Sequence, residues 1–312
     1  MTLDPVILFF LLGLAARLLK SDLRLPEPIY EALSVYLLLA LGLKGGIELA
    51  RYPLSQLGPQ IAAVIALGCV LPLLAFVALC ALGRLPRADA ASIAAHYGSV
   101  SVVTFAAAMT WIEVRGIPAE AYLPLFVALL EAPGIIVGVL LARGVSGGAA
   151  QWGGVLREVM TGKSVILLLG GLAIGAVLGP AGVEPVAPWF FDLFKGALTL
   201  FMLELGLVTG RQLGALRTSG VFLVAFGIVT PLVFGMIGAV LGVLLGLSEG
   251  GATVLAVLAA SASYIAAPAA MRVAVPEANP GLSLPVVLGV TFPFNLLIGF
   301  PVYHAYVLWL SR

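Results

Sequence analysis

The sequence predicts an all-α integral membrane protein with ten transmembrane helices, arranged as two inverted repeats of five in which the fourth and ninth helices are broken. Three observations carry this prediction: the composition, the spacing of the apolar segments and a duplicated polar break. Of the 312 residues, 62% are hydrophobic and 10% are charged, whereas soluble domains carry about 25% charged residues. This composition favours a chain that crosses the membrane several times.

Apolar segments separated by short polar stretches occur ten times along the chain, and most are long enough for a tilted transmembrane helix. Residues 143–162 form the longest polar stretch, a short Gly-rich linker that we expect in the cytoplasm. This linker separates a first repeat, residues 1–142, from a second, inverted repeat, residues 163–312. The expected segments are 5–19, 29–50, 57–82, 89–112, 119–142, 163–180, 188–210, 218–246, 250–273 and 283–310.

Short patterns recur in the same order in the two halves. Leu-Gly-Leu at 41–43 returns at 205–207, Pro72 returns as Pro231, and the prolines around the fifth segment return around the tenth. Because each half holds an odd number of spans, the second half must enter the membrane from the opposite side. The pattern therefore predicts an inverted repeat.

Basic residues predict the orientation, because Lys and Arg concentrate in cytoplasmic loops. With both termini outside, the majority of these residues lie on the cytoplasmic side, so we expect a multi-pass protein of the plasma (inner) membrane in that orientation. No positive region precedes the first apolar segment, which is therefore expected to remain as a span. The cytoplasmic residues would be Arg17, Lys20, Arg24, Arg84, Arg87, Arg143, Arg157, Lys163, Arg211, Arg217 and Arg272, and the external ones Lys44, Arg51, Arg115, Lys195 and Arg312.

The fourth and ninth segments each contain small, hydroxyl-bearing residues where a helix would otherwise continue. Residues 98–104 read Gly-Ser-Val-Ser-Val-Val-Thr, and residues 261–264 read Ser-Ala-Ser-Tyr. Paired breaks of this kind are typical of the midplane site of transporters. Two half-helix N-termini facing a common point would favour a small anion. The candidate substrate-binding residues are Gly98, Ser99, Ser101, Thr104, Ser261, Ser263 and Tyr264.

Other interpretations of these residues stay open from the sequence. Small residues also serve close helix packing. Glu131 lies in an apolar run and is a candidate for sodium binding or proton coupling, but a structural ion pair or a subunit contact would also explain it, and the same holds for Glu204. Lys44 and Glu48 are spaced to pair along one helix face. His96 is expected to be a hydrogen-bonded structural residue, and titration near neutral pH that tunes anion access is the open alternative.

The sequence contains no Gly-rich phosphate loop, metal-ligand pattern or nucleophile motif. We therefore expect no enzyme activity and no cofactor, with sodium only as a coupling ion. The net charge of +1 gives no reason to expect nucleic acid as a partner. Two alternatives to sodium-coupled transport remain: a proton-coupled or uncoupled carrier of another small anion, and an intramembrane lipid-modifying enzyme using Glu131, Glu204 or His96 as acid or base.

Several segments spread over nearly the whole chain together carry a family resemblance. They are Leu-Gly-Leu-Lys-Gly-Gly at 41–46, Gly-Ser-Val-Ser with Thr104 at 98–104, Glu-Ala-Pro at 131–133, Leu-Arg-Glu at 156–158, the run 261–272, and Val-Pro-Glu-Ala-Asn-Pro at 275–280. With these segments the sequence resembles the sodium-dependent bicarbonate permeases of the cyanobacterial type.

The resemblance implies import of bicarbonate with sodium, with both ions held between the broken fourth and ninth helices. It also implies ten spans in two inverted halves, similar to a shortened sulfate-permease fold, and a homotrimer in which a core domain moves against a gate domain within the lipid. Well-known members are regulated by a PII-like partner. They carry a longer linker than residues 143–162, and this is the point at which the present chain departs from the family pattern.

Overall fold

The computed structural model describes residues 4–52, 54–143, 153, 157 and 160–312. These residues are all-helical, without a strand among them. Seven segments of the described chain are long and apolar enough to cross a membrane, as expected for a multi-pass membrane protein. Most of the predicted linker, residues 143–162, lies outside the described residues. The seven segments are Glu27–Leu49, Leu57–Ala81, Arg87–Val114, Leu123–Arg143, Lys163–Val186, Gly220–Leu244 and Pro280–Leu310.

The first helices follow the predicted segments closely. Helix α1 (Pro5–Leu18) is only 14 residues long and begins at Asp4, whose carboxylate accepts a hydrogen bond from the Val6 N–H at 2.9 Å. The helices that follow are α2 (Glu27–Leu49), α3 (Leu54–Ala81), α4 (Arg87–Gly98), α5 (Val102–Val114), α6 (Leu123–Arg143) and α8 (Lys163–Val183).

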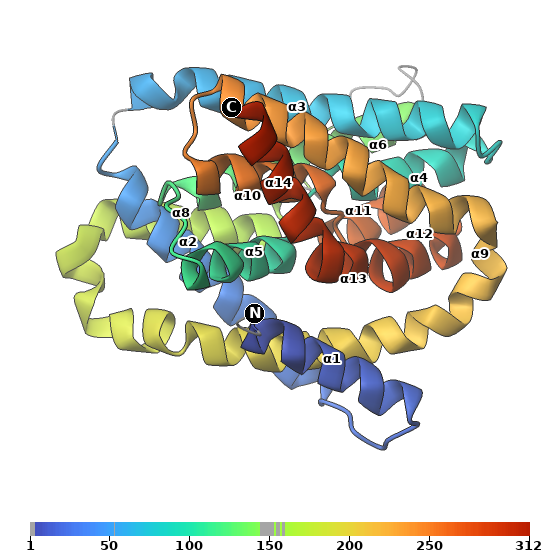
Figure 1. Ribbon diagram of the computed structural model, residues 1–312, viewed down its shortest axis with the longest axis horizontal. Coiled ribbons are helices and arrows are strands. Elements are labelled where there is room, and N and C mark those ends of the chain that lie inside the picture. Colours follow the sequence, from blue (N-terminus) through green and yellow to red (C-terminus); the bar gives the residue numbers. More distant parts are fainter. Residues whose placement is uncertain (1–3, 53, 144–152, 154–156, 158–159) are drawn as a thin grey trace.

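The predicted seventh and eighth segments, 188–210 and 218–246, meet in one long helix, α9 (Phe194–Leu244), which bends at Gly220. Gly220 has φ 77° and ψ 158°, a conformation that a side chain would strain. The bend lets the first part of α9 pack against α1 and the second part against α10 (Glu249–Ala260), as Figure 1 shows.

The C-terminal segment is a series of short helical pieces instead of one regular helix. These pieces are α11 (Ala266–Ala274), α12 (Pro280–Val286), α13 (Phe292–Phe294) and α14 (Phe300–Leu310), with wider π-type turns at 287–291 and 295–299. Prolines at 285, 293 and 301 lack the N–H that a regular α-helix needs, and the wider turns lie next to them.

Two pairs of helices make especially close contact, α1 with the first part of α9 and α2 with α8. Glycines allow both approaches, because a Cβ on Gly42 of α2 would lie 2.9 Å from the Cα of Gly171 in α8. A Cβ on Gly206 of α9 would lie 2.7 Å from the Leu14 nitrogen and 3.0 Å from the Gly13 carbonyl carbon in α1. The matched Leu-Gly-Leu patterns therefore make matched contacts.

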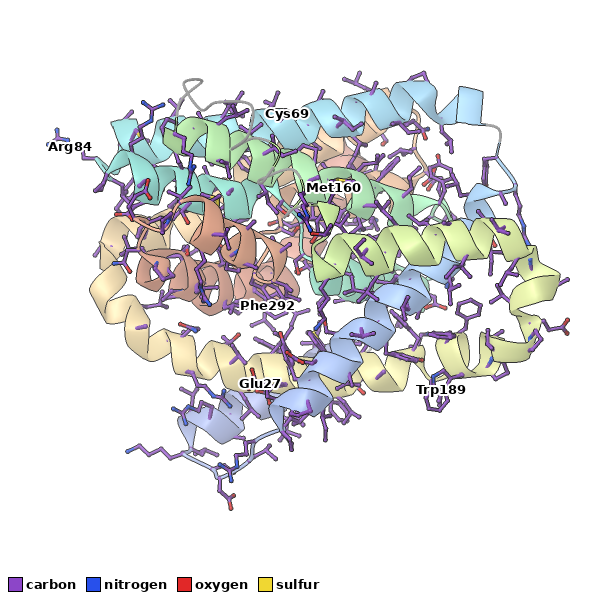
Figure 2. The ribbon with its side chains drawn as sticks, turned by 180° about the vertical axis from the view of Figure 1, so that it is seen from behind. Glu27, Cys69, Arg84, Met160, Trp189 and Phe292 are labelled. Atoms are coloured by element: carbon purple, nitrogen blue, oxygen red, sulfur yellow. The ribbon has the colours of Figure 1, made fainter. Side chains whose placement is uncertain are left out.

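The remaining helices surround the two broken segments. Helix α3 packs on α4 and α6, and α10 packs on the second part of α9 and on α14. Figure 1 shows α4, α10 and α11 lying between α3 and the lower layer of α1 and α9. In Figure 2, Phe292 lies in the interior, whereas Trp189 and Arg84 lie at the periphery. The breaks therefore lie inside the protein.

Candidate functional site

Both predicted breaks are present, and they have the same local form. Helix α4 ends at Gly98 and α10 ends at Ala260, each after 12 residues. The next residue is extended in both cases, with φ −102° and ψ 159° at Ser99, and φ −80° and ψ 166° at Ser261. The chain resumes as α5 after the first break and as α11 after the second.

The two breaks lie directly against each other and exchange hydrogen bonds. The Ser263 N–H donates to the His96 carbonyl oxygen at 2.8 Å. The Ser101 N–H donates to the Ser261 hydroxyl oxygen at 3.1 Å, and the Ser261 hydroxyl in turn donates to the Leu258 carbonyl at 2.8 Å. These three bonds therefore satisfy backbone groups that the interrupted helices leave without partners.

Matched serines cap the second half of each broken helix. The Ser101 hydroxyl oxygen accepts from the Thr104 N–H at 3.1 Å, and the Ser263 hydroxyl oxygen accepts from the Ala267 N–H at 3.2 Å. The hydroxyl hydrogen of Ser263 remains free to donate, and the Ser101 hydroxyl interacts with the neighbouring Tyr264 hydroxyl. We use the name crossing for the place where the two breaks, residues 98–104 and 261–266, meet. The N-termini of α5 and α11 bring partial positive charge to the crossing, so the arrangement favours an anion.

A small cavity lies where the crossing meets α6 and α8. Its polar lining comes from Ser101, Ser263, Tyr264, Glu131 and Ser164. The cavity measures about 10 Å³, about the room that one water molecule needs. The structure therefore holds the crossing in a closed form.

Two groups at this cavity are buried without hydrogen-bond partners in the part of the chain that the structure describes. They are the Tyr264 hydroxyl and the Oε2 atom of Glu131. Buried polar groups nearly always have a partner, so an orphaned hydroxyl and an orphaned carboxylate oxygen at one small cavity are typical of a ligand site. Together they offer a donor for an anion and an oxygen ligand for a cation.

The other predicted site residues lie at the crossing but do not line the cavity. The Ser99 hydroxyl is buried without a partner among the described residues. Thr104 is buried in the first turn of α5, and Ser261 is occupied by the bonds between the breaks. Gly98 has a packing role, because a Cβ there would meet Pro72, and a Cβ on Gly134 would overlap the Gly98 backbone.

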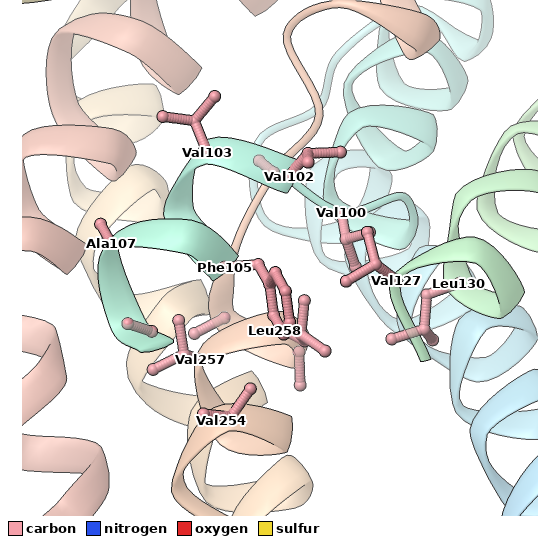
Figure 3. Packing of buried hydrophobic residues seen from close by; sticks show 14 of the residues in the cluster. Val100, Val102, Val103, Phe105, Ala107, Val127, Leu130, Val254, Val257 and Leu258 are labelled. Carbon is pink, nitrogen blue, oxygen red and sulfur yellow. The ribbon is translucent and has the colours of Figure 1, made fainter. Parts of the chain in front are cut away.

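Apolar side chains close the crossing off from water. Figure 3 shows Val100, Val102 and Phe105 beside Val127 and Leu130 of α6. On the other side, Figure 3 places Val254, Val257 and Leu258 of α10 against α5. Within such a dry surrounding, electrostatic attraction to an ion is stronger than in water.

Of the four further polar residues that the sequence singled out, His96, Glu204 and Glu48 have hydrogen-bond or ion-pair partners in the described chain. His96 is structural as expected, since its Nδ1 lies 2.6 Å from the Ser263 carbonyl oxygen. Glu204 lies 3.5 Å from Arg211 and accepts from the Leu25 N–H, so the ion-pair interpretation holds there. The expected pair of Lys44 and Glu48 is wrong, because Glu48 instead pairs with Arg51 at 3.0 Å.

Lys44 lines a much larger cavity, of about 520 Å³, between α2, α5 and the start of α9. Lys195, Glu113 and Asp192 also line it, and Lys195 and Glu113 form an ion pair at 3.1 Å. Phe105, one residue after Thr104, lies at its wall, so the cavity approaches the break between α4 and α5.

Sequence reasoning missed Ser164 and the role of Lys44. Ser164 follows the linker in the sequence, far from either break, and no pattern within its own segment connects it to them. Lys44 was singled out only for its spacing from Glu48, whereas a lysine inside an apolar segment is itself a signal for a cavity.

Comparison with protein families gives one match over nearly the whole chain. The model of the Na+-dependent bicarbonate transporter superfamily matches residues 5–308. No individual curated protein matches the sequence.

Proposed function

Because this chain belongs to the Na+-dependent bicarbonate transporter superfamily, we propose that it is a secondary active transporter that imports bicarbonate together with sodium. The family supplies the transporter role, and the specific substrate and coupling ion are our proposal. The observation that carries it is the crossing of two broken helices around the orphaned Tyr264 hydroxyl and Glu131 carboxylate oxygen.

The anion would bind at the N-termini of α5 and α11. Its oxygens would accept hydrogen bonds from the hydroxyl groups of Ser101, Ser263 and Tyr264, together with first-turn N–H groups. Ser99 and Thr104 are further candidate donors. Gly98 and Ser261 would position the chain and not touch the anion.

Sodium would bind beside the anion, through Glu131 and neighbouring oxygens such as the Ser164 hydroxyl. Alkali and alkaline-earth cations prefer oxygen ligands of this kind. A joint site couples the two ions, because each lowers the cost of burying the other's charge in a dry cavity.

The architecture that fits this proposal is ten spans in two inverted repeats. Matched glycine contacts at Gly42 and Gly206, and two broken helices with first halves of 12 residues, support it. We further propose the plasma (inner) membrane with both termini outside, and a homotrimer embedded in lipid. A PII-like regulator is a further proposed partner.

Transport requires the closed crossing to open. The crossing cavity has about 10 Å³, whereas the cavity beside Lys44 has about 520 Å³ and reaches Phe105. We propose that the larger cavity is the external entry route and that movement of the crossing against α2 and the first part of α9 opens the path between them.

Uptake of labelled bicarbonate into proteoliposomes, with and without an inward sodium gradient, tests the proposal. We expect uptake only with the gradient, and its loss in Ser101→Ala and Ser263→Ala. Ser34→Ala, a buried serine of α2 away from the cavity, is the matched control. Normal uptake in both site variants would refute the proposed site.

The same assay separates the alternatives. Uptake that follows a pH gradient and ignores sodium would indicate a proton-coupled carrier, and uptake that ignores both would indicate an uncoupled one. Absence of bicarbonate uptake, with transport of another small anion, would change the substrate. Turnover of lipid by the purified protein without ion movement would replace the transporter proposal with an intramembrane enzyme.

A further inference from the structure

A second polar pocket lies on the other side of His96 from the crossing. It is bounded by α4, α11 and the start of α12 and measures about 110 Å³. Its polar lining comes from Ser92, His96, Arg272 and Ser283. It shares no lining residue with the crossing cavity, so a ligand here would occupy a separate site.

Hydrogen bonds from neighbouring helices fix the pocket's wall. The Arg143 Nε donates to the Ala274 carbonyl at 2.6 Å, and the Asn279 N–H donates to the Asp89 carboxylate at 2.7 Å. The first bond anchors the end of α11 to α6, and the second anchors the segment after α11 to α4. The wall is therefore held in place without a ligand.

His96 lines this pocket, and one of its two ring nitrogens has no hydrogen-bond partner among the described residues. The Ser263 carbonyl can only accept a hydrogen bond, so Nδ1, 2.6 Å from it, carries the ring hydrogen. In a neutral imidazole the other nitrogen, Nε2, is then an acceptor. The His96 side chain is fully buried, and its Nε2 has no hydrogen-bond partner among the described residues.

The remaining groups define the chemistry of a matching ligand. Arg272 is exposed at the pocket, and no acidic side chain of the described chain forms an ion pair with it. The hydroxyls of Ser92 and Ser283 can donate or accept. A ligand that satisfies all of these groups carries negative charge for Arg272 and an O–H that donates to Nε2.

We propose that this pocket binds a small oxyanion that retains a proton, either bicarbonate or hydrogen phosphate. Its O–H donates to Nε2 of His96, and its charged oxygens face Arg272 and the two serines. A planar anion without a proton, such as nitrate, leaves Nε2 unsatisfied and binds more weakly. The site is independent of the transport proposal, because it predicts binding whether or not the protein moves bicarbonate.

Occupation of this pocket preserves the hydrogen bond that already joins His96 to the second break. A ligand that donates to Nε2 favours the tautomer with hydrogen on Nδ1, the one that donates to the Ser263 carbonyl. Basic residues Arg143 and Arg272 lie on this side of the protein, which the positive-inside rule makes cytoplasmic. We therefore expect the anion to reach this pocket from the cytoplasmic side.

Calorimetric titration of the full-length protein in detergent tests the site. Bicarbonate, phosphate and nitrate are titrated into a Ser101→Ala background, which removes the proposed crossing site. We expect binding of bicarbonate or phosphate, about tenfold weaker binding of nitrate, and a loss of about tenfold or more in affinity with Arg272→Gln. The tighter binder of bicarbonate and phosphate is the ligand that the site prefers.

Arg84→Gln in the same background is the matched control, because Arg84 points away from the protein in Figure 2 and does not line the pocket. It should leave the affinity unchanged. Ser92→Ala provides a second variant in case Arg272→Gln folds poorly, and it should also weaken binding. Unchanged affinity in Arg272→Gln and Ser92→Ala, or nitrate binding as tightly as bicarbonate and phosphate, would overturn the proposal. The titration measures binding alone, so its result stands even if the protein shows no bicarbonate uptake in the proteoliposome assay.

Discussion

The Ser101 N–H donates a hydrogen bond to the Ser261 hydroxyl oxygen, 3.1 Å away, so the first broken helix is tied to the second. The same hydroxyl donates to the last turn of α10 at Leu258. One side chain thus bonds to backbone groups of both breaks. This serine belongs to the structural support of the crossing, whereas Ser101 and Ser263 face its cavity.

Ser261→Ala should destabilise the protein by about 1–3 kcal/mol, because it leaves the buried Ser101 N–H without a partner. Thermal or denaturant unfolding in detergent measures this change. Ser34→Ala, in which no such bond is lost, should have a smaller effect. Equal stability of the two variants would contradict the role assigned to Ser261.

Gly42→Ala and Gly206→Ala should each destabilise the protein by about 1–3 kcal/mol through overpacking. The added Cβ would press on the backbone of α8 in the first case and of α1 in the second. Gly170→Ala is the matched control, since its Cβ would meet no atom within 4 Å. The same unfolding assay applies, and equal effects at Gly42 and Gly170 would argue against the close helix contact.

Glu131→Gln should raise the sodium concentration for half-maximal uptake by about tenfold or more, because the cation loses a charged ligand while the side chain keeps its shape. Uptake measured over a range of sodium concentrations gives this value. Glu204→Gln removes a carboxylate that is paired with Arg211 and lies outside the cavity. That control should lower stability and leave the sodium dependence unchanged.

Lys44→Gln should raise the KM for bicarbonate at low ionic strength by about tenfold, with little change in the maximal rate. Lys44 is exposed in the cavity that we assign to anion entry, where positive charge raises the local anion concentration. The difference should shrink as salt is added, because the attraction is screened. Arg51→Gln removes a positive charge that is paired with Glu48 and lies outside the cavity, and a shift as large there would argue against a specific role for Lys44.

Much of the helical layout follows from local sequence rules. Apolar runs predicted the spanning helices, and small residues at 98–104 and 261–264 predicted both breaks. These features are local, since a helix needs a continuous apolar run and a break needs residues that can satisfy the backbone in extended form. Three local expectations failed. The seventh and eighth segments join in α9, and the tenth is a series of short helical pieces. Glu48 pairs with the nearer Arg51 and not with Lys44.

The sequence alone determined that this is a membrane protein with two matched, broken helices and named the residues at each break. Only the tertiary structure decided what each of those residues does there. Ser101, Ser263 and Tyr264 reach a cavity with Glu131 and Ser164, whereas Gly98 and Ser261 support the packing around it. The physical reason is that helix breaks are set by neighbours along the chain, while hydrogen bonds and cavities depend on groups brought together from distant helices.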